Sequence, residues 1–210
     1  MPMHEGGVQT FGRAAFLRAG MVGAATVAGT ALVAPSARAG LPAPVPVDDD
    51  VGYLQFTATG ELVAVSLGTT LLQAPGFTAA QRQRLQALRA GSKRHLARLS
   101  LVLGADAPQF GDFDLQVPAP PGGTPKARLA TSLDLAGLLA GVYLAAVSDT
   151  VDAATRGLHG RLLWSQAQQV STLRVLSGLP SVAGGLPVPI PLEAAVPRLD
   201  AYLADAEPPV

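Results

Sequence analysis

The sequence contains no cysteine and few of the other side chains that bind metals or act as catalytic acids and bases. Without cysteine the chain has no disulfide bond, no thiolate metal site, no cysteine nucleophile and no cysteine-linked lipid anchor. Any metal or acid–base centre must therefore be built from the aspartates and from a short set of histidines and glutamates. These residues are His4, His95, His159, Glu5, Glu61, Glu193 and Glu207.

The chain also has no excess of charge of either sign. It carries 15 basic and 15 acidic residues, so bulk charge gives no reason to expect nucleic acid as a partner. Apolar residues make up 49% and charged residues 14% of the sequence, which excludes a chain that is disordered throughout. A length of 210 residues fits one domain with appendages better than two domains.

Residues 1–39 have the pattern of an export signal. Arg13 and Arg18 precede an uncharged stretch rich in Ala, Gly and Val, and Ala-Arg-Ala at 37–39 fits a cleavage site. Residues 12–18 resemble the twin-arginine export motif, with an alanine in place of the second arginine. An uncleaved membrane anchor is the alternative, but Gly and Ala contribute little transfer free energy. We therefore expect export, to the cell envelope or outside the cell.

Helical periodicity follows a short linker at residues 40–47. Hydrophobic residues recur at steps of three and four over 51–73, 78–103, 129–148 and 152–177, which predicts four long helices. Thr78 and Gln81 form a capping box at the second start, and Gly178 fits the end of the fourth helix. No strand series or internal repeat interrupts this pattern.

Two proline-rich segments complete the organisation. Residues 105–126 are a long connection between the second and third helices, of a length that is unusual unless it spans a bundle from end to end. Residues 179–210 form a proline-rich tail with one short helix from about residue 192. Two antiparallel pairs joined by a long crossover predict an all-α, ferritin-like four-helix bundle over residues 48–178.

Several segments carry a family resemblance. Residues 50–56 with Glu61, the run that starts at His95, and residues 141–146, 173–178 and 186–192 resemble the ferritin-like domain of bacterial exported and desiccation-related proteins. The similarity covers residues 48–205. It implies a ferritin-like fold and, in iron-binding members, a di-iron centre whose ligands are two single Glu residues and two Glu-x-x-His pairs.

The ligand pattern of that family is only partly present. Glu61 matches the first Glu and His95 the first His, but Ser92 stands where the Glu partner of His95 would be. Asp134 is the acid nearest to the expected ligand of the third helix. The resemblance therefore implies a degenerate metal site of Glu61, His95 and Asp134.

Two amides stand at the ligand positions of the fourth helix. Gln166 and Gln169 occupy the corresponding pair, and neutral amides hydrogen-bond readily inside a closed bundle. A bare buried carboxylate is costly, so Glu61 needs a partner, which protonated His95 could supply. Our interpretation is a site converted from metal coordination to a polar core, in which Ser92, Gln166 and Gln169 join that pair.

Plainer roles are open for each of these residues. Glu61 could point to solvent, and His95 could be a lone core histidine. Asp134 lies three residues after Thr131, so a capping role competes with ligation.

The remaining notable side chains have structural interpretations. His159 is expected at the surface, and Trp164 and Tyr143 are expected to fill the core. The basic residues of the second helix are expected to form a solvated face; they are Arg82, Arg84, Arg89, Lys93 and Arg94. No G-x-S-x-G elbow or phosphate-binding glycine loop is present, and no spacing supports a catalytic triad.

These observations favour an exported, non-enzymatic protein with a binding, protective or structural role and no resident cofactor. One alternative is a working degenerate site that binds iron or manganese and has residual oxidase activity. Another is an assembly module that forms homo-oligomers through its bundle faces or tail.

Overall fold

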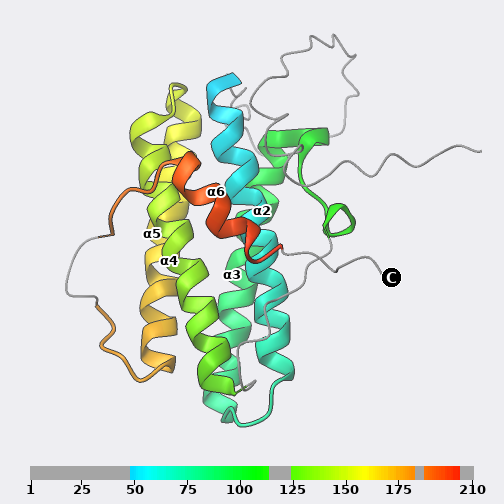
Figure 1. Cartoon of the computed structure of the whole chain (residues 1–210), viewed down its shortest axis with the longest axis vertical. Coiled ribbons are helices and arrows are strands. Elements are labelled where there is room, and N and C mark those ends of the chain that lie inside the picture. The colour runs from blue at the N-terminus through cyan, green and yellow to red at the C-terminus, as the bar shows by residue number, and fades with distance from the viewer. Residues whose placement is uncertain (1–47, 114–123, 183–186, 204–210) are drawn as a thin grey trace, which may run out of the picture.

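The described part of the chain is an all-α bundle (Figure 1), which confirms the predicted all-α class. The computed structural model describes residues 48–113, 124–182 and 187–203, so the expected export signal and linker lie outside it. Within these residues there is no strand. The helices are α2 (Asp48–Gln73), α3 (Ala79–Leu103), α4 (Pro125–Asp149), α5 (Ala153–Leu176) and α6 (Leu192–Asp200), with single turns η1 (Gly104–Asp106) and η2 (Phe110–Asp112) after α3.

Local signals set the helix ends. At the start of α3 the capping box is confirmed: the Gln81 backbone N–H donates to Thr78 Oγ1 at 3.2 Å, and the Thr78 N–H donates to Gln81 Oε1 at 2.9 Å. The third helix starts at Pro125 rather than near Leu129, because proline is well suited to the first turn and Thr124 caps it. Gly178 follows the end of α5 with a φ of +76°, a conformation that glycine adopts without strain.

The four long helices pack side by side. α2 packs on α3 and α4 packs on α5, and the pairs meet where α2 contacts α4 and α3 contacts α5. In Figure 1, α2 and α5 run downward while α3 and α4 run upward. The chain therefore leaves α3 at one end of the bundle and enters α4 at the other, as expected for a long crossover. The short helix α6 lies across α2 and α4.

The middle of helix α4 is buried inside the bundle. Leu138, Val142 and Tyr143 have no solvent exposure, because α2 and α5 cover one side of the helix and α6 with its preceding segment covers another. By length and apolar composition α4 is the one described helix that could cross a membrane, and 61% of that stretch is buried inside the bundle.

A close approach fixes the proline-rich tail on α4. The Ile190 N–H donates to the Gly141 carbonyl at 3.0 Å, and a Cβ added at Gly141 would stand 2.5 Å from Ile190 Cδ1. Only glycine leaves room for this contact. The segment before α6 therefore packs directly on the middle of α4.

Candidate functional site

Four polar side chains, one from each long helix, form a hydrogen-bonded chain in the centre of the bundle. Glu61 Oε1 of α2 lies 2.7 Å from His95 Nδ1 of α3 and accepts a 2.9 Å hydrogen bond from the Tyr143 hydroxyl of α4. His95 Nε2 lies 2.7 Å from Ser165 Oγ of α5. Glu61 and Tyr143 are fully buried and His95 is 3% exposed. We call these four residues the central polar chain.

Helical spacing carries Glu61 into the core. It shares a stripe of α2 with Leu54, Ala58 and Val65, which are all buried, and residues three or four apart lie on one helical face. The predicted alternative, that Glu61 points to solvent, is wrong. His95 reaches the same layer from the buried stripe of α3.

The electrostatics of the chain favour a protonated Tyr143. Burial, followed by the charge of Glu61 and its hydrogen bond, raises the pKa of Tyr143 well above its ordinary value. The phenol therefore remains a hydrogen-bond donor to the carboxylate. Glu61 Oε2 has no hydrogen-bond partner among the described residues, so Oε1 alone carries the polar contacts of this side chain.

The predicted polar residues Ser92, Gln166 and Gln169 form a separate, adjacent group. Ser92 Oγ donates to Gln169 Oε1 at 3.3 Å, and Gln166 Nε2 donates to the Ala136 carbonyl at 3.2 Å. All three side chains line a small cavity of about 40 Å³. The structure thus places the five residues in two neighbouring groups rather than in one network.

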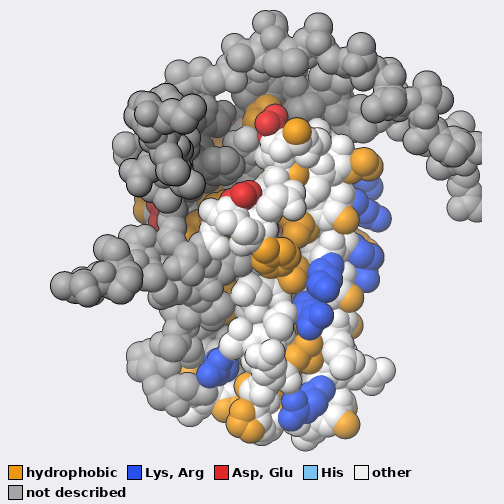
Figure 2. Space-filling view, turned by 90° about the vertical axis from the view of Figure 1, so that its right-hand side faces the viewer, with side chains coloured by type: hydrophobic (Ala, Val, Ile, Leu, Met, Phe, Trp, Pro, Cys, Tyr) orange, Lys and Arg blue, Asp and Glu red, His pale blue; other side chains and the backbone are white. Residues whose placement is uncertain are grey.

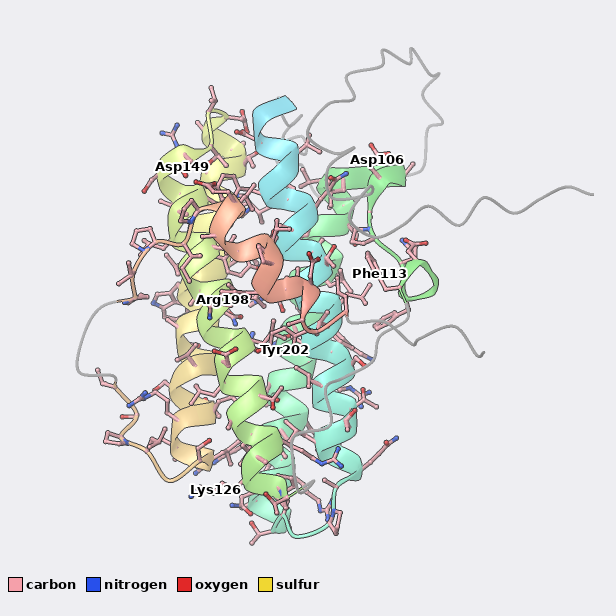
Figure 3. All side chains as sticks on the ribbon, in the orientation of Figure 1. Asp106, Phe113, Lys126, Asp149, Arg198 and Tyr202 are labelled. Atoms are coloured by element: carbon pink, nitrogen blue, oxygen red, sulfur yellow. The ribbon has the colours of Figure 1, made fainter. Side chains whose placement is uncertain are left out.

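Asp134 does not join Glu61 and His95. It contacts the C-terminal segment instead: the Tyr202 hydroxyl donates to Oδ2 at 2.5 Å, and Arg198 lies 3.5 Å from Oδ1. Both partners are labelled in Figure 3. A capping role with Thr131 is also wrong, because α4 starts at Pro125. Thr131 instead donates to the Ala127 carbonyl inside the helix.

His159 is buried, contrary to the surface position that we expected. Its ring centroid lies 6.4 Å from that of Tyr53 and 6.0 Å from that of Tyr143. Neither ring nitrogen has a hydrogen-bond partner within the described chain. Burial lowers the pKa of His159 from 6.5 to about 4, with the charge of Asp50 acting in the opposite direction. His159 is therefore neutral in the folded protein at neutral pH.

Hydrogen bonds from backbone N–H groups to a buried aspartate hold the turn between α4 and α5. The sequence analysis did not predict them. Asp50 is fully buried and accepts hydrogen bonds from the backbone N–H groups of Val151 and Asp152 at 2.8 and 2.9 Å. At the same end of the bundle the Tyr53 hydroxyl donates to Asp149 Oδ2 at 2.5 Å. These contacts tie the start of α2 to the second helical pair.

The potential metal ligands at this site do not fit a di-metal centre. Such centres use several carboxylates with imidazoles on facing helices, whereas the described residues hold no group of three or more His, Asp or Glu side chains in reach of one ion. Glu61 Oε1 is already shared by His95 and Tyr143. The amide of Gln166 donates to a backbone carbonyl, so its nitrogen is turned toward α4.

The central polar chain brings all four long helices together at one carboxylate and one imidazole. Its defining feature is one buried carboxylate oxygen that contacts an imidazole and a phenol from two other helices. A serine hydroxyl of the fourth helix completes the chain. Comparison with protein-family models, curated proteins and solved structures gave no match to this chain.

Proposed function

We propose that this chain is an exported ferritin-like protein in which a hydrogen-bonded core takes the place of the di-iron centre. Its role, in the cell envelope or outside the cell, is non-enzymatic: binding, protection or structural support. The antiparallel pairs and the end-to-end connection between α3 and α4 support a ferritin-like topology. Residues 1–39 support export through their signal-like pattern.

The double contact at Glu61 Oε1 carries the proposal. An imidazole nitrogen at 2.7 Å and a phenol oxygen at 2.9 Å satisfy the carboxylate oxygen that a metal ion would otherwise use. Removing the partner of a buried hydrogen-bonded polar group typically costs about 1–3 kcal/mol. The central polar chain therefore makes the carboxylate a structural element of the bundle.

Metal counting tests this proposal. The mature protein is purified from cells supplemented with iron and manganese, and its metal content is measured by mass spectrometry beside Glu61→Gln. Asp134→Asn is the matched control, because it removes an exposed carboxylate of the same bundle. We expect far less than one metal ion per chain in all three proteins.

The stability of the same proteins gives the second readout. Glu61→Gln disturbs the buried contacts with His95 and Tyr143, so we expect it to lower the free energy of unfolding by about 1–3 kcal/mol. Asp134→Asn should change it by less than about 1 kcal/mol, since its pairing is exposed. One iron or manganese ion per chain that is lost in Glu61→Gln and retained in Asp134→Asn would overturn the proposal.

A further inference from the structure

Helices α3 and α5 carry only positive charge. Neither helix contains Asp or Glu, although the whole chain has no net charge. Figure 2 faces the side of the bundle opposite to α5 and shows Lys and Arg side chains from its upper to its lower part, with acidic side chains confined to the upper part. The basic residues of the two helices are Arg82, Arg84, Arg89, Lys93, Arg94, Arg98, Arg156, Arg161 and Arg174.

An open hollow of about 600 Å³ lies between these two helices. Gly157 and Gly160 of α5 form part of its wall. Its volume lies in the range of small-molecule sites. We call it the α3–α5 hollow; its polar and aromatic lining residues are Arg94, Arg98, Arg161, His95, Ser165 and Trp164.

Within the part of the chain that the structure describes, the three arginines of the hollow have no acidic partner. The ion pairs found among the described residues join Glu61 to His95 and Asp134 to Arg198, and no acid lines the hollow. Three unpaired guanidinium groups around one cavity create a positive potential that attracts anions. Guanidinium groups bind phosphate and carboxylate oxygens with two parallel hydrogen bonds.

Two further features favour a ligand site over a solvated surface that binds nothing. Trp164 is 69% exposed and lies beside the arginines in the hollow, where its indole ring offers a stacking surface. His95, which is 97% buried, and Ser165 also line the hollow and are joined by a 2.7 Å contact. The hollow therefore combines cationic, aromatic and hydrogen-bonding groups.

We propose that the α3–α5 hollow binds a phosphomonoester attached to a planar ring. The phosphate dianion contacts Arg94, Arg98 and Arg161, and the ring packs on Trp164. Three guanidinium charges favour a dianion over a single carboxylate. This inference goes beyond the proposed function, since it requires neither export nor the loss of a metal site.

Titration with phenyl phosphate tests the proposal, with inorganic phosphate and phenol as the two half-ligands. Trp164 is the only tryptophan of the chain, so its fluorescence reports on the hollow, and calorimetry gives the affinity independently. We expect saturable binding of phenyl phosphate that is at least tenfold tighter than that of inorganic phosphate. Phenol alone should not bind measurably.

Variants locate the site. Arg161→Gln should weaken phenyl phosphate binding at least tenfold, while Lys93→Gln should change it less than twofold. Lys93 is the matched control because it is exposed on α3 and carries the same charge outside the hollow. In calorimetry, Trp164→Leu should abolish the preference for phenyl phosphate over inorganic phosphate. Circular dichroism checks that each variant is folded.

Three results would overturn the proposal. The first is equal affinity for phenyl phosphate and inorganic phosphate. The second is equal weakening by Arg161→Gln and Lys93→Gln, which would indicate a diffuse charge effect. The third is binding to phosphatidylglycerol vesicles without binding of phenyl phosphate, which would identify a surface for anionic lipids.

Discussion

Acidification should destabilise the bundle through His159. The ring is buried between Tyr53 and Tyr143 without a hydrogen-bond partner in the described chain, and burial lowers its pKa from 6.5 to about 4. The unfolded chain therefore takes up a proton at higher pH than the folded chain does. The stabilisation is complete above pH 6.5, decreases as the pH falls toward 4, and does not decrease further below that.

The size of the effect follows from the pKa difference. Each pKa unit corresponds to about 1.4 kcal/mol, so the change from 6.5 to about 4 represents about 3 kcal/mol of unfolding free energy. Nearby groups act on the same ring: Asp50 favours its protonation, and the protonated phenols of Tyr53 and Tyr143 add no charge. About 3 kcal/mol is a large share of the stability of a small domain.

The assay is urea unfolding followed by far-ultraviolet circular dichroism, at pH values between about 7 and 4, for the wild type and His159→Leu. Leucine keeps the site apolar and of similar volume but cannot take up a proton. The wild type should lose about 3 kcal/mol more than His159→Leu over this range. Carboxylates such as Asp152, whose pKa is lowered mainly by its hydrogen bonds to Thr155, contribute equally to both proteins. The same pH dependence in both proteins would refute the reasoning.

Two further predictions concern packing and capping. Gly141→Ala places a Cβ 2.5 Å from Ile190 and 3.0 Å from the Val188 carbonyl, so it should lower the unfolding free energy by about 1–3 kcal/mol relative to Gly137→Ala. A Cβ added at Gly137 would meet no atom within 4 Å, so Gly137→Ala is the control. A Gly141→Ala variant that is more stable than the wild type would contradict the contact between the tail and α4. Thr78→Ala should cost about 1 kcal/mol in thermal or urea unfolding, and Thr78→Ser should restore most of it; equal losses in both variants would exclude the cap as the cause.

Helix positions were predictable because their signals are local. The capping box at Thr78 and the hydrophobic stripes depend only on neighbours in the sequence. The need of Glu61 for a partner was also predictable from the cost of a bare buried carboxylate. The structure supplies that partner as His95, with Tyr143 as a second donor.

The contacts and the exposure of the other site residues depend on how each helix is rotated in the bundle. Tyr143 lies in the core as expected. Its contact with Glu61, and that of Ser165 with His95, depend on how α4 and α5 pack against the first pair, which no local spacing specifies. Trp164 was expected in the core but is 69% exposed. It precedes Ser165 on α5 and points to the solvent side of the helix. The burial of His159 could have been predicted from helical spacing, because His159 shares a stripe of α5 with Leu162 and Gln166, which are both buried. Asp134 was misread because α6 and the segment after it cover that side of α4.

The distribution of the central polar chain over all four helices has a consequence for folding. Each antiparallel pair closes through a short turn and makes mainly local contacts, whereas the two pairs meet only after the long connection between α3 and α4 has closed. Glu61 and His95 belong to the first pair, and Tyr143 and Ser165 belong to the second. A docking error of one helical turn would move Tyr143 about 5.4 Å along its axis and separate it from Glu61. These buried hydrogen bonds, together with the contacts of Asp50 and Ser92 across the same boundary, favour one alignment of the two pairs.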